Sequence, residues 1–128
     1  MTVRAITLLV AATVLAVGCG RSPERDVRDT LRTLERAIAE KNYQRLCDDV
    51  FSEKLVEQVR ETLPCEVALQ RSEIETLRDP KLEVKSIKVD GSTATAEVAS
   101  SAANQKPSED TVRLVKEGDD WRVVALSS

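Results

Sequence analysis

The stretch IKVDGSTATAEV (residues 87–98) determines the fold class, because it has the pattern of two β-strands joined by a tight turn. Apolar and polar residues alternate on both sides of the dipeptide Asp90-Gly91, which is a strong signal for a hairpin turn. In the second arm, alternate positions carry small apolar residues, namely Ala94, Ala96 and Val98. The stretch therefore predicts an antiparallel hairpin with one buried face.

Besides the second arm of this hairpin, three other strands are expected in the sheet. In the strand before the turn, the apolar residues Leu82 and Val84 occupy even positions, whereas Ile87 and Val89 occupy odd positions. This change of alternation near residues 85–86 predicts a β-bulge. Downstream, residues 110–116 and 121–126 form a second predicted hairpin around a turn at 117–120. The polar residues 101–109, which include Pro107, are expected to form a loop between the two hairpins.

Helices are expected before the strands. Ser22 is a favourable N-cap and Pro23 suits the first helical position. Apolar residues then recur at spacings of about four, three and four along residues 23–40, which predicts an amphipathic helix. Asn42 and Ser52 are the expected caps of two further helices, and a short fourth helix is expected after residue 64. The order predicts an α+β fold, with N-terminal helices packed on a curved, cone-like antiparallel sheet of four strands.

The first residues of the chain have the organisation of a signal peptide. Arg4 is followed by the 13 uncharged and mostly apolar residues 5–17, a run shorter than the roughly 20 that span a bilayer. The sequence Leu15-Ala16-Val17-Gly18-Cys19 resembles the lipobox of bacterial lipoproteins. It predicts a lipoprotein signal peptide at 1–18, a lipidated tether at 19–22 and one domain at 23–128. The alternative is an ordinary signal peptide that releases a soluble secreted protein from the same cleavage site.

Lipidation of Cys19 would place the protein on the outer face of a bacterial membrane, in the extracytoplasmic cell envelope. Two or three acyl chains such as palmitate hold a protein there durably. The remaining cysteines are then a pair, Cys47 and Cys65, for which an oxidising compartment favours a disulfide. This bond would link the second helix to the fourth. The alternative is two buried thiols that act as small apolar residues.

The composition limits the function. The 128 residues carry a net charge of −3 and contain no His and one each of Phe, Trp and Tyr. With no basic patch and few aromatic rings, a nucleic-acid partner is not expected. The absence of His removes the commonest general base and the commonest transition-metal ligand. No motif for a cofactor, a metal or a catalytic residue is found in the sequence.

Three segments resemble the nuclear transport factor 2-like superfamily, which includes SnoaL-like and ketosteroid-isomerase-like domains. These segments are residues 42–47, 87–98 and 112–123, and the last contains Glu117-Gly118-Asp119-Asp120-Trp121. The resemblance implies a cone-shaped α+β fold, and related domains often form homodimers. Enzymes of the superfamily place a Tyr, an Asp or a His–Asp pair inside the cone. Tyr43 is instead expected at the edge of the core with its hydroxyl group outward, and Asp48-Asp49 and Asp119-Asp120 are interpreted as structural.

The small residues of the sheet are the candidate site. They could leave room for an apolar pocket in the mouth of the curved sheet, or they could let a helix pack closely. The residues that could line such a pocket are Ala94, Ala96, Val98, Val112, Leu114 and Trp121.

These features predict a membrane-anchored, non-catalytic domain that binds a small apolar ligand or an envelope protein. The alternative function is an isomerase- or dehydratase-like enzyme that uses Asp or Glu in the cone.

Replacement of the lipidation site tests the predicted anchor. Cys19→Ala is expected to move the protein from the membrane fraction to the soluble fraction, because the variant lacks the thiol that carries the acyl chains. Immunoblotting of fractionated cells measures the distribution, and Gly20→Ala is the matched control that should stay on the membrane. A Cys19→Ala variant that remains membrane-bound and normally processed would contradict the lipoprotein prediction.

Overall fold

The computed structural model describes residues 22–127, and the predicted signal peptide and Cys19 lie outside the described residues. The helical segments come first: α1 (Pro23–Ala39), α2 (Tyr43–Arg45), the π-helical turn η1 (Leu46–Val50), α3 (Glu53–Arg60), α4 (Cys65–Gln70) and the 3₁₀ turn η2 (Glu73–Thr76). The strands follow: β1 (Lys81–Asp90), β2 (Thr93–Ala102), β3 (Gln105–Glu117) and β4 (Asp120–Ser127).

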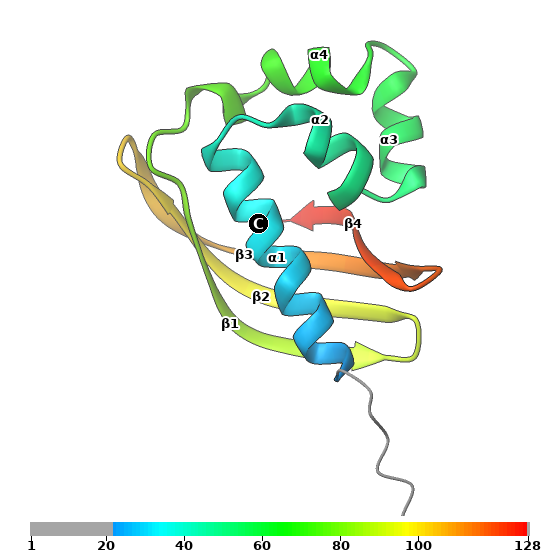
Figure 1. The fold of residues 1–128 in the computed structure, drawn as a ribbon. Helices are drawn as coiled ribbons and strands as arrows, with labels where there is room; N and C mark the ends of the chain where they lie inside the picture. Colours follow the sequence, from blue (N-terminus) through cyan, green and yellow to red (C-terminus); the bar gives the residue numbers. More distant parts are fainter. Residues whose placement is uncertain (1–21, 128) are drawn as a thin grey trace, which may run out of the picture.

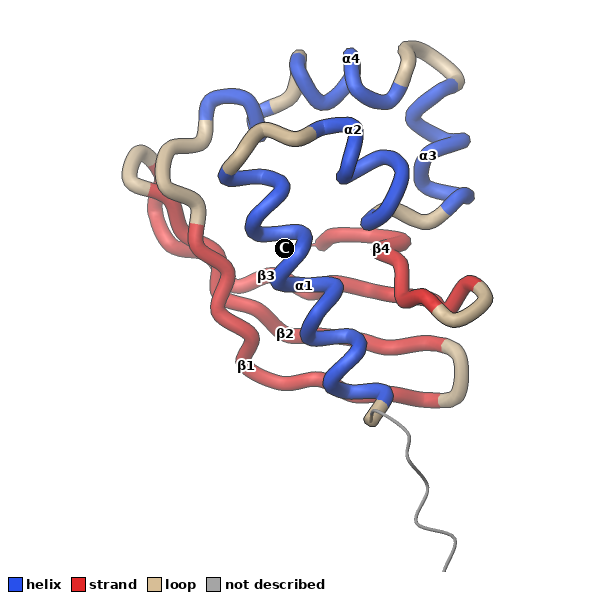
Figure 2. Tube along the Cα trace, viewed as in Figure 1, coloured by secondary structure: helices blue, strands red, loops and turns tan. Residues whose placement is uncertain are grey.

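The four strands form one antiparallel sheet in the order β1-β2-β3-β4. The sheet is curved, and α1 lies across its concave side while the shorter helices gather beyond the C-terminal end of α1 (Figure 1). Helices and strands thus form two layers (Figure 2). The predicted α+β class, with helices on one face of a four-stranded antiparallel sheet, is confirmed. No helix within residues 22–127 has the length and apolar character needed to cross a membrane.

Helix α1 begins and packs as its sequence predicts. The Ser22 hydroxyl oxygen accepts a hydrogen bond from the N–H of Arg25 at 3.3 Å, and Pro23 opens the first turn. Val27 and Leu31 are fully buried, and Leu34 is 2% exposed. These side chains belong to the same hydrophobic cluster as the small residues of the sheet. The apolar face of α1 therefore covers the concave side of the sheet.

The predicted hairpin and bulge are both present. Gly91 has a φ of +59°, in the left-handed region that glycine adopts without steric cost, and it lies in the turn between β1 and β2. The register of the β1–β2 pair shifts between Val84 and Ser86, where the bulge was expected. Ala96 is fully buried, whereas Thr95 is exposed, so the alternation in β2 separates the two faces of the sheet as predicted.

The prediction of a loop at residues 101–109 is wrong. Most of it is strand, because β2 continues to Ala102 and β3 begins at Gln105. Pro107 is tolerated there since β4 pairs with β3 only from Thr111 onward, so this part of β3 needs hydrogen bonds on one side only. The β2–β3 register also shifts between Ser100 and Ala102, close to the proline. The polar composition thus reflects an exposed hairpin end.

A disulfide joins the helical segments. Cys47 in η1 and Cys65 at the start of α4 are bonded, with their Cα atoms 6.1 Å apart, in agreement with the prediction from the cysteine count. Both residues are buried, with exposed fractions of 5% and 0%. The bond ties α4 to the helical segment that contacts α1 and β4.

Two neighbouring substitutions test which face of β2 is buried. Ala94→Asp is expected to lower the free energy of unfolding by about 3 kcal/mol or more, because Ala94 is 4% exposed and the carboxylate would be buried without a partner. Thr93→Asp, at an exposed position, is expected to cost about 1 kcal/mol or less. Urea denaturation followed by circular dichroism compares the two; a larger loss in Thr93→Asp would mean that the faces are reversed, and equal losses would contradict a single buried face.

Candidate functional site

The concave face of the sheet changes from apolar to polar along β2 and β3. Toward one end the inward positions are filled by apolar residues, namely Ala94, Ala96, Val98, Val112 and Leu114. Toward the other end the same faces carry Ser100, Ser108 and Asp110, and the register pairs Val98 with Asp110 and Ser100 with Ser108. Polar residues at positions where the fold alone would favour apolar ones often mark a functional site.

These three polar residues form a hydrogen-bonded cluster. The Ser100 hydroxyl donates a hydrogen bond to Oδ2 of Asp110, and the Ser108 hydroxyl donates to the same oxygen at 3.1 Å. The two serine oxygens are 3.4 Å apart. Ser100 and Asp110 are partly buried. The cluster therefore holds a carboxylate at a fixed place on the inner face of the sheet.

A cavity of about 190 Å³ lies beside this cluster. It is formed between the C-terminal half of α1, the start of β1 and the adjoining ends of β2 and β3. Its walls come from both layers of the fold: Leu34, Glu35, Ile38, Leu77, Pro80, Lys81, Leu82, Ser100, Ser101, Ala102, Gln105, Lys106, Ser108 and Asp110. Most of the apolar lining comes from α1 and the segment at the start of β1, and most of the polar lining comes from β2 and β3.

Helix α1 contributes both kinds of group. Leu34 and Ile38 belong to its apolar stripe, and Glu35 lies beside them. The carboxylate of Glu35 accepts a hydrogen bond from the backbone N–H of Leu82 at 2.5 Å. This bond ties the helix to the edge strand β1 and fixes the width of the cavity at that side.

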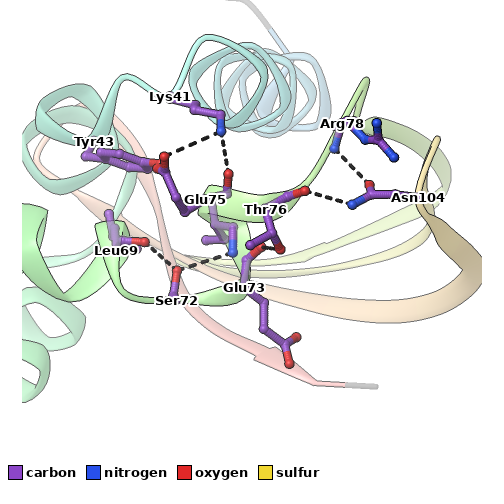
Figure 3. A network of polar contacts seen from close by, with 10 residues as sticks. Lys41, Tyr43, Leu69, Ser72, Glu73, Glu75, Thr76, Arg78 and Asn104 are labelled. Carbon is purple, nitrogen blue, oxygen red and sulfur yellow. Dashed lines mark hydrogen bonds and ion pairs between the residues drawn. The ribbon is translucent and has the colours of Figure 1, made fainter.

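A clamp at the β2–β3 turn lies beside one end of the cavity. The Asn104 side-chain amide donates to the carbonyl of Thr76 at 2.8 Å, and its Oδ1 accepts from the N–H of Arg78 at 2.9 Å (Figure 3). The N–H of Ala103 also donates to the carbonyl of Arg78 at 2.7 Å. Because these bonds are made by the residues on either side of Leu77, the clamp holds Leu77 beside the β2–β3 turn.

A second set of polar contacts anchors η2 to the junction of α1 and α2. The hydroxyl of Tyr43 donates to the carboxylate of Glu75, and the ammonium of Lys41 lies 3.5 Å from the same carboxylate (Figure 3). Tyr43 is 8% exposed. Its ring is thus in the core, and the outward hydroxyl expected from the sequence is used to position the segment that leads to the cavity.

The six residues expected to line a pocket lie mainly in the core. All six, from Ala94 to Trp121, have exposed fractions of 4% or less and belong to the main hydrophobic cluster with α1. The cavity at Asp110 lies further along the same strands and is lined by other residues. Sequence reasoning missed it because residues 101–109 were interpreted as a loop. The continued alternation of Ser108, Asp110 and Val112 was the signal that could have revealed it.

The candidate carboxylates Asp48, Asp49, Asp119 and Asp120 lie elsewhere. Asp49, Asp119 and Asp120 line an open recess of about 520 Å³ beside Trp121, on the N-terminal half of α1, whereas Asp48 lines a separate recess. Charged neighbours are present, since Arg122 lies 3.6 Å from Asp120 and Arg45 lies 4.0 Å from Asp49. Within residues 22–127, no group of three or more His, Cys, Asp or Glu residues is arranged to hold a metal ion.

The layered arrangement is the nuclear transport factor 2-like fold, as two similar solved structures show. NTF2-like proteins of unknown function from Silicibacter pomeroyi DSS-3 and Shewanella baltica OS155 match with TM-scores of 0.61 and 0.57 and identities of 17% and 15%. Each match covers 80% of this chain, and 91% and 89% of the other chain. A SEC-C motif containing protein from Rhodopseudomonas palustris matches at a TM-score of 0.56 and 17% identity, over 77% of this chain and 75% of its own.

The sequence narrows this class to one family. Residues 33–127 match the family model described as "Putative lumazine-binding", and the chain belongs to that family. The match runs from the second half of α1 to the end of β4, so it includes the cavity and all four strands. No curated protein is significantly similar to the chain in sequence.

Removal of the Asn104 clamp tests how the end of the cavity is held. Asn104→Ala removes two hydrogen bonds between the β2–β3 turn and residues 76–78, and we expect a loss of about 1–2 kcal/mol in the free energy of unfolding. Hydrogen exchange should accelerate at the Arg78 amide, whose acceptor is lost. Lys106→Ala, at an exposed position on the same hairpin end, is the control and should leave the exchange at Arg78 unchanged. Unchanged exchange in Asn104→Ala would contradict the clamp.

Proposed function

We propose that the protein is a membrane-anchored, extracytoplasmic lipoprotein whose domain binds a small ligand in the cavity between α1 and the polar ends of β2 and β3. The observation that carries the proposal is the Ser100–Ser108–Asp110 cluster on the inner face of the sheet, opposite the apolar residues of α1. A mostly apolar cavity with a few placed polar groups is the usual form of a small-molecule site.

The cavity limits the size and shape of the ligand. Its volume of about 190 Å³ is below the roughly 300–1,000 Å³ of sites for drug-sized molecules, so the ligand is small. The three aromatic residues of the chain, Tyr43, Phe51 and Trp121, are not among the residues that line it. Recognition therefore depends on hydrogen bonds to the edge of the ligand and on aliphatic contacts, because no ring is available for stacking.

Lumazine is the ligand that the family description suggests, and it is a small heterocycle with N–H donors and carbonyl acceptors along its edge. These groups complement a cavity that offers the carboxylate of Asp110 and the ammonium groups of Lys81 and Lys106. We propose that the ligand is a heterocycle of this kind.

The proposed anchor supports a role in binding at the membrane. A lipid on Cys19 would place the domain a few residues from the bilayer, because α1 begins at Pro23. There the domain would meet ligands that enter or leave the envelope. A partner protein or a second copy of the chain could receive the ligand.

Filling the cavity tests the proposed site. Equilibrium dialysis of the full-length protein in detergent is expected to show lumazine binding to the wild type and at least about tenfold weaker binding to Ala102→Phe, because the added ring occupies the cavity. Ala103→Phe is the matched control, since the adjacent Ala103 is exposed in the turn and does not line the cavity. The proposal fails if the wild type does not bind lumazine, or if Ala102→Phe binds it as well as Ala103→Phe does.

One observation favours the alternative function, an isomerase- or dehydratase-like enzyme. Two carboxylates, Glu35 and Asp110, line the same cavity, and paired carboxylates can serve as general acid and general base. Glu35 already accepts a backbone hydrogen bond, which suits it to holding the wall rather than to moving a proton. Asp110 is therefore the candidate base of this alternative.

A further inference from the structure

We propose that Asp110 selects the ligand by its hydrogen-bond donors: the cavity takes a neutral molecule with an N–H group on its edge, such as an amide, imide or ureide. This inference rests on the proposed function and specifies the chemistry that the site recognises. Asp110 would be a specificity-determining residue that contacts the ligand directly.

One oxygen of the Asp110 carboxylate is open to a hydrogen bond from a ligand. Both serine hydroxyls donate to Oδ2 of Asp110, and Oδ1 accepts no hydrogen bond from the residues that the structure describes. An ionised carboxylate has about four acceptor positions, so this one retains acceptor capacity. A hydrogen bond to a charged acceptor contributes more than a neutral one. The open oxygen of Asp110 is therefore the strongest acceptor on the polar side of the cavity.

The two serines of the cluster offer a ligand acceptors and no donor. A hydroxyl group has one hydrogen to donate, and Ser100 and Ser108 each direct it to Asp110. Their oxygens then have only lone pairs left for a ligand. The cluster as a whole accepts hydrogen bonds and does not donate them, so a ligand must supply the donor.

The charges around the cavity favour a neutral ligand. Lys81 and Lys106 also line the cavity, and their positive charges could attract an anion. Both are exposed, so solvent and salt screen them, whereas Asp110 is partly buried. A ligand carboxylate or phosphate would face Asp110 at short range and be repelled. A neutral ligand can donate its N–H to Asp110 and accept from a lysine through a carbonyl group.

A matched pair of ligands tests the inference. Lumazine has N–H donors, and its 1,3-dimethyl derivative has the same ring system with both pyrimidine N–H groups replaced by N-methyl groups. The wild-type protein is expected to bind lumazine on the order of tenfold to a hundredfold more tightly than the dimethyl derivative. Asp110→Asn, which keeps the shape of the side chain and removes its charge, is expected to reduce this preference to about threefold or less.

Two controls separate the possible outcomes. Glu109→Gln removes a similar charge from the neighbouring exposed position on β3 and should keep the wild-type preference. If Asp110→Asn proves unstable, Ser108→Ala gives the test: it removes one donor to Oδ2 and leaves the carboxylate with more acceptor capacity, so the preference for lumazine is expected to rise, and a fall would contradict the inference.

If the wild type binds both ligands equally and Ala102→Phe abolishes both, the cavity is the site but the inference about Asp110 is wrong. A preference that is unchanged in a folded Asp110→Asn variant likewise overturns it. If the wild type binds neither ligand, the proposed function fails and the inference fails with it.

Discussion

The packing of α1 on the concave face of the sheet is the interaction on which the rest of the structure depends. Val27 and Leu31 are fully buried in the same cluster as Ala96 and Val112. The small side chains of β2 belong to the same buried cluster as the apolar face of α1, and burial of these apolar groups stabilises the fold by removing them from water. Without this contact, neither the helix nor the sheet would have a partner for its apolar face.

The candidate site lies where this apolar contact ends. Beyond Val98 the inner face of the sheet carries Ser100 and Asp110, and a polar bond from Glu35 to β1 joins the apolar packing as a link between the layers. Glu35 holds α1 to β1, and Asn104 holds the β2–β3 turn to the segment before β1. The apolar core sets the distance between the helical layer and the sheet. The hydrogen bonds of Glu35 and Asn104 keep the cavity open at the border of this core.

Covalent and polar links add to the apolar packing of the helical segments beyond α1. The Cys47–Cys65 disulfide closes a loop over a sequence separation of 18, which stabilises by about 3 kcal/mol in the chain-entropy model. Tyr43 and Lys41 then fix η2 through Glu75. Because η2 leads directly to Leu77, the same links that stabilise these segments also position one wall of the cavity.

The sequence by itself determined the order of helices and strands, the buried face of β2, the bulge near Lys85 and the pairing of the two cysteines. These features follow from local periodicity, turn chemistry and counting, which need no knowledge of distant neighbours. Only the tertiary structure decided that residues 101–109 are mostly strand and that Ser100, Asp110 and Glu35 meet around one cavity. Polar residues carry no periodic hydrophobic signal, so whether they form a loop or line a site depends on which strand and helix pack beside them.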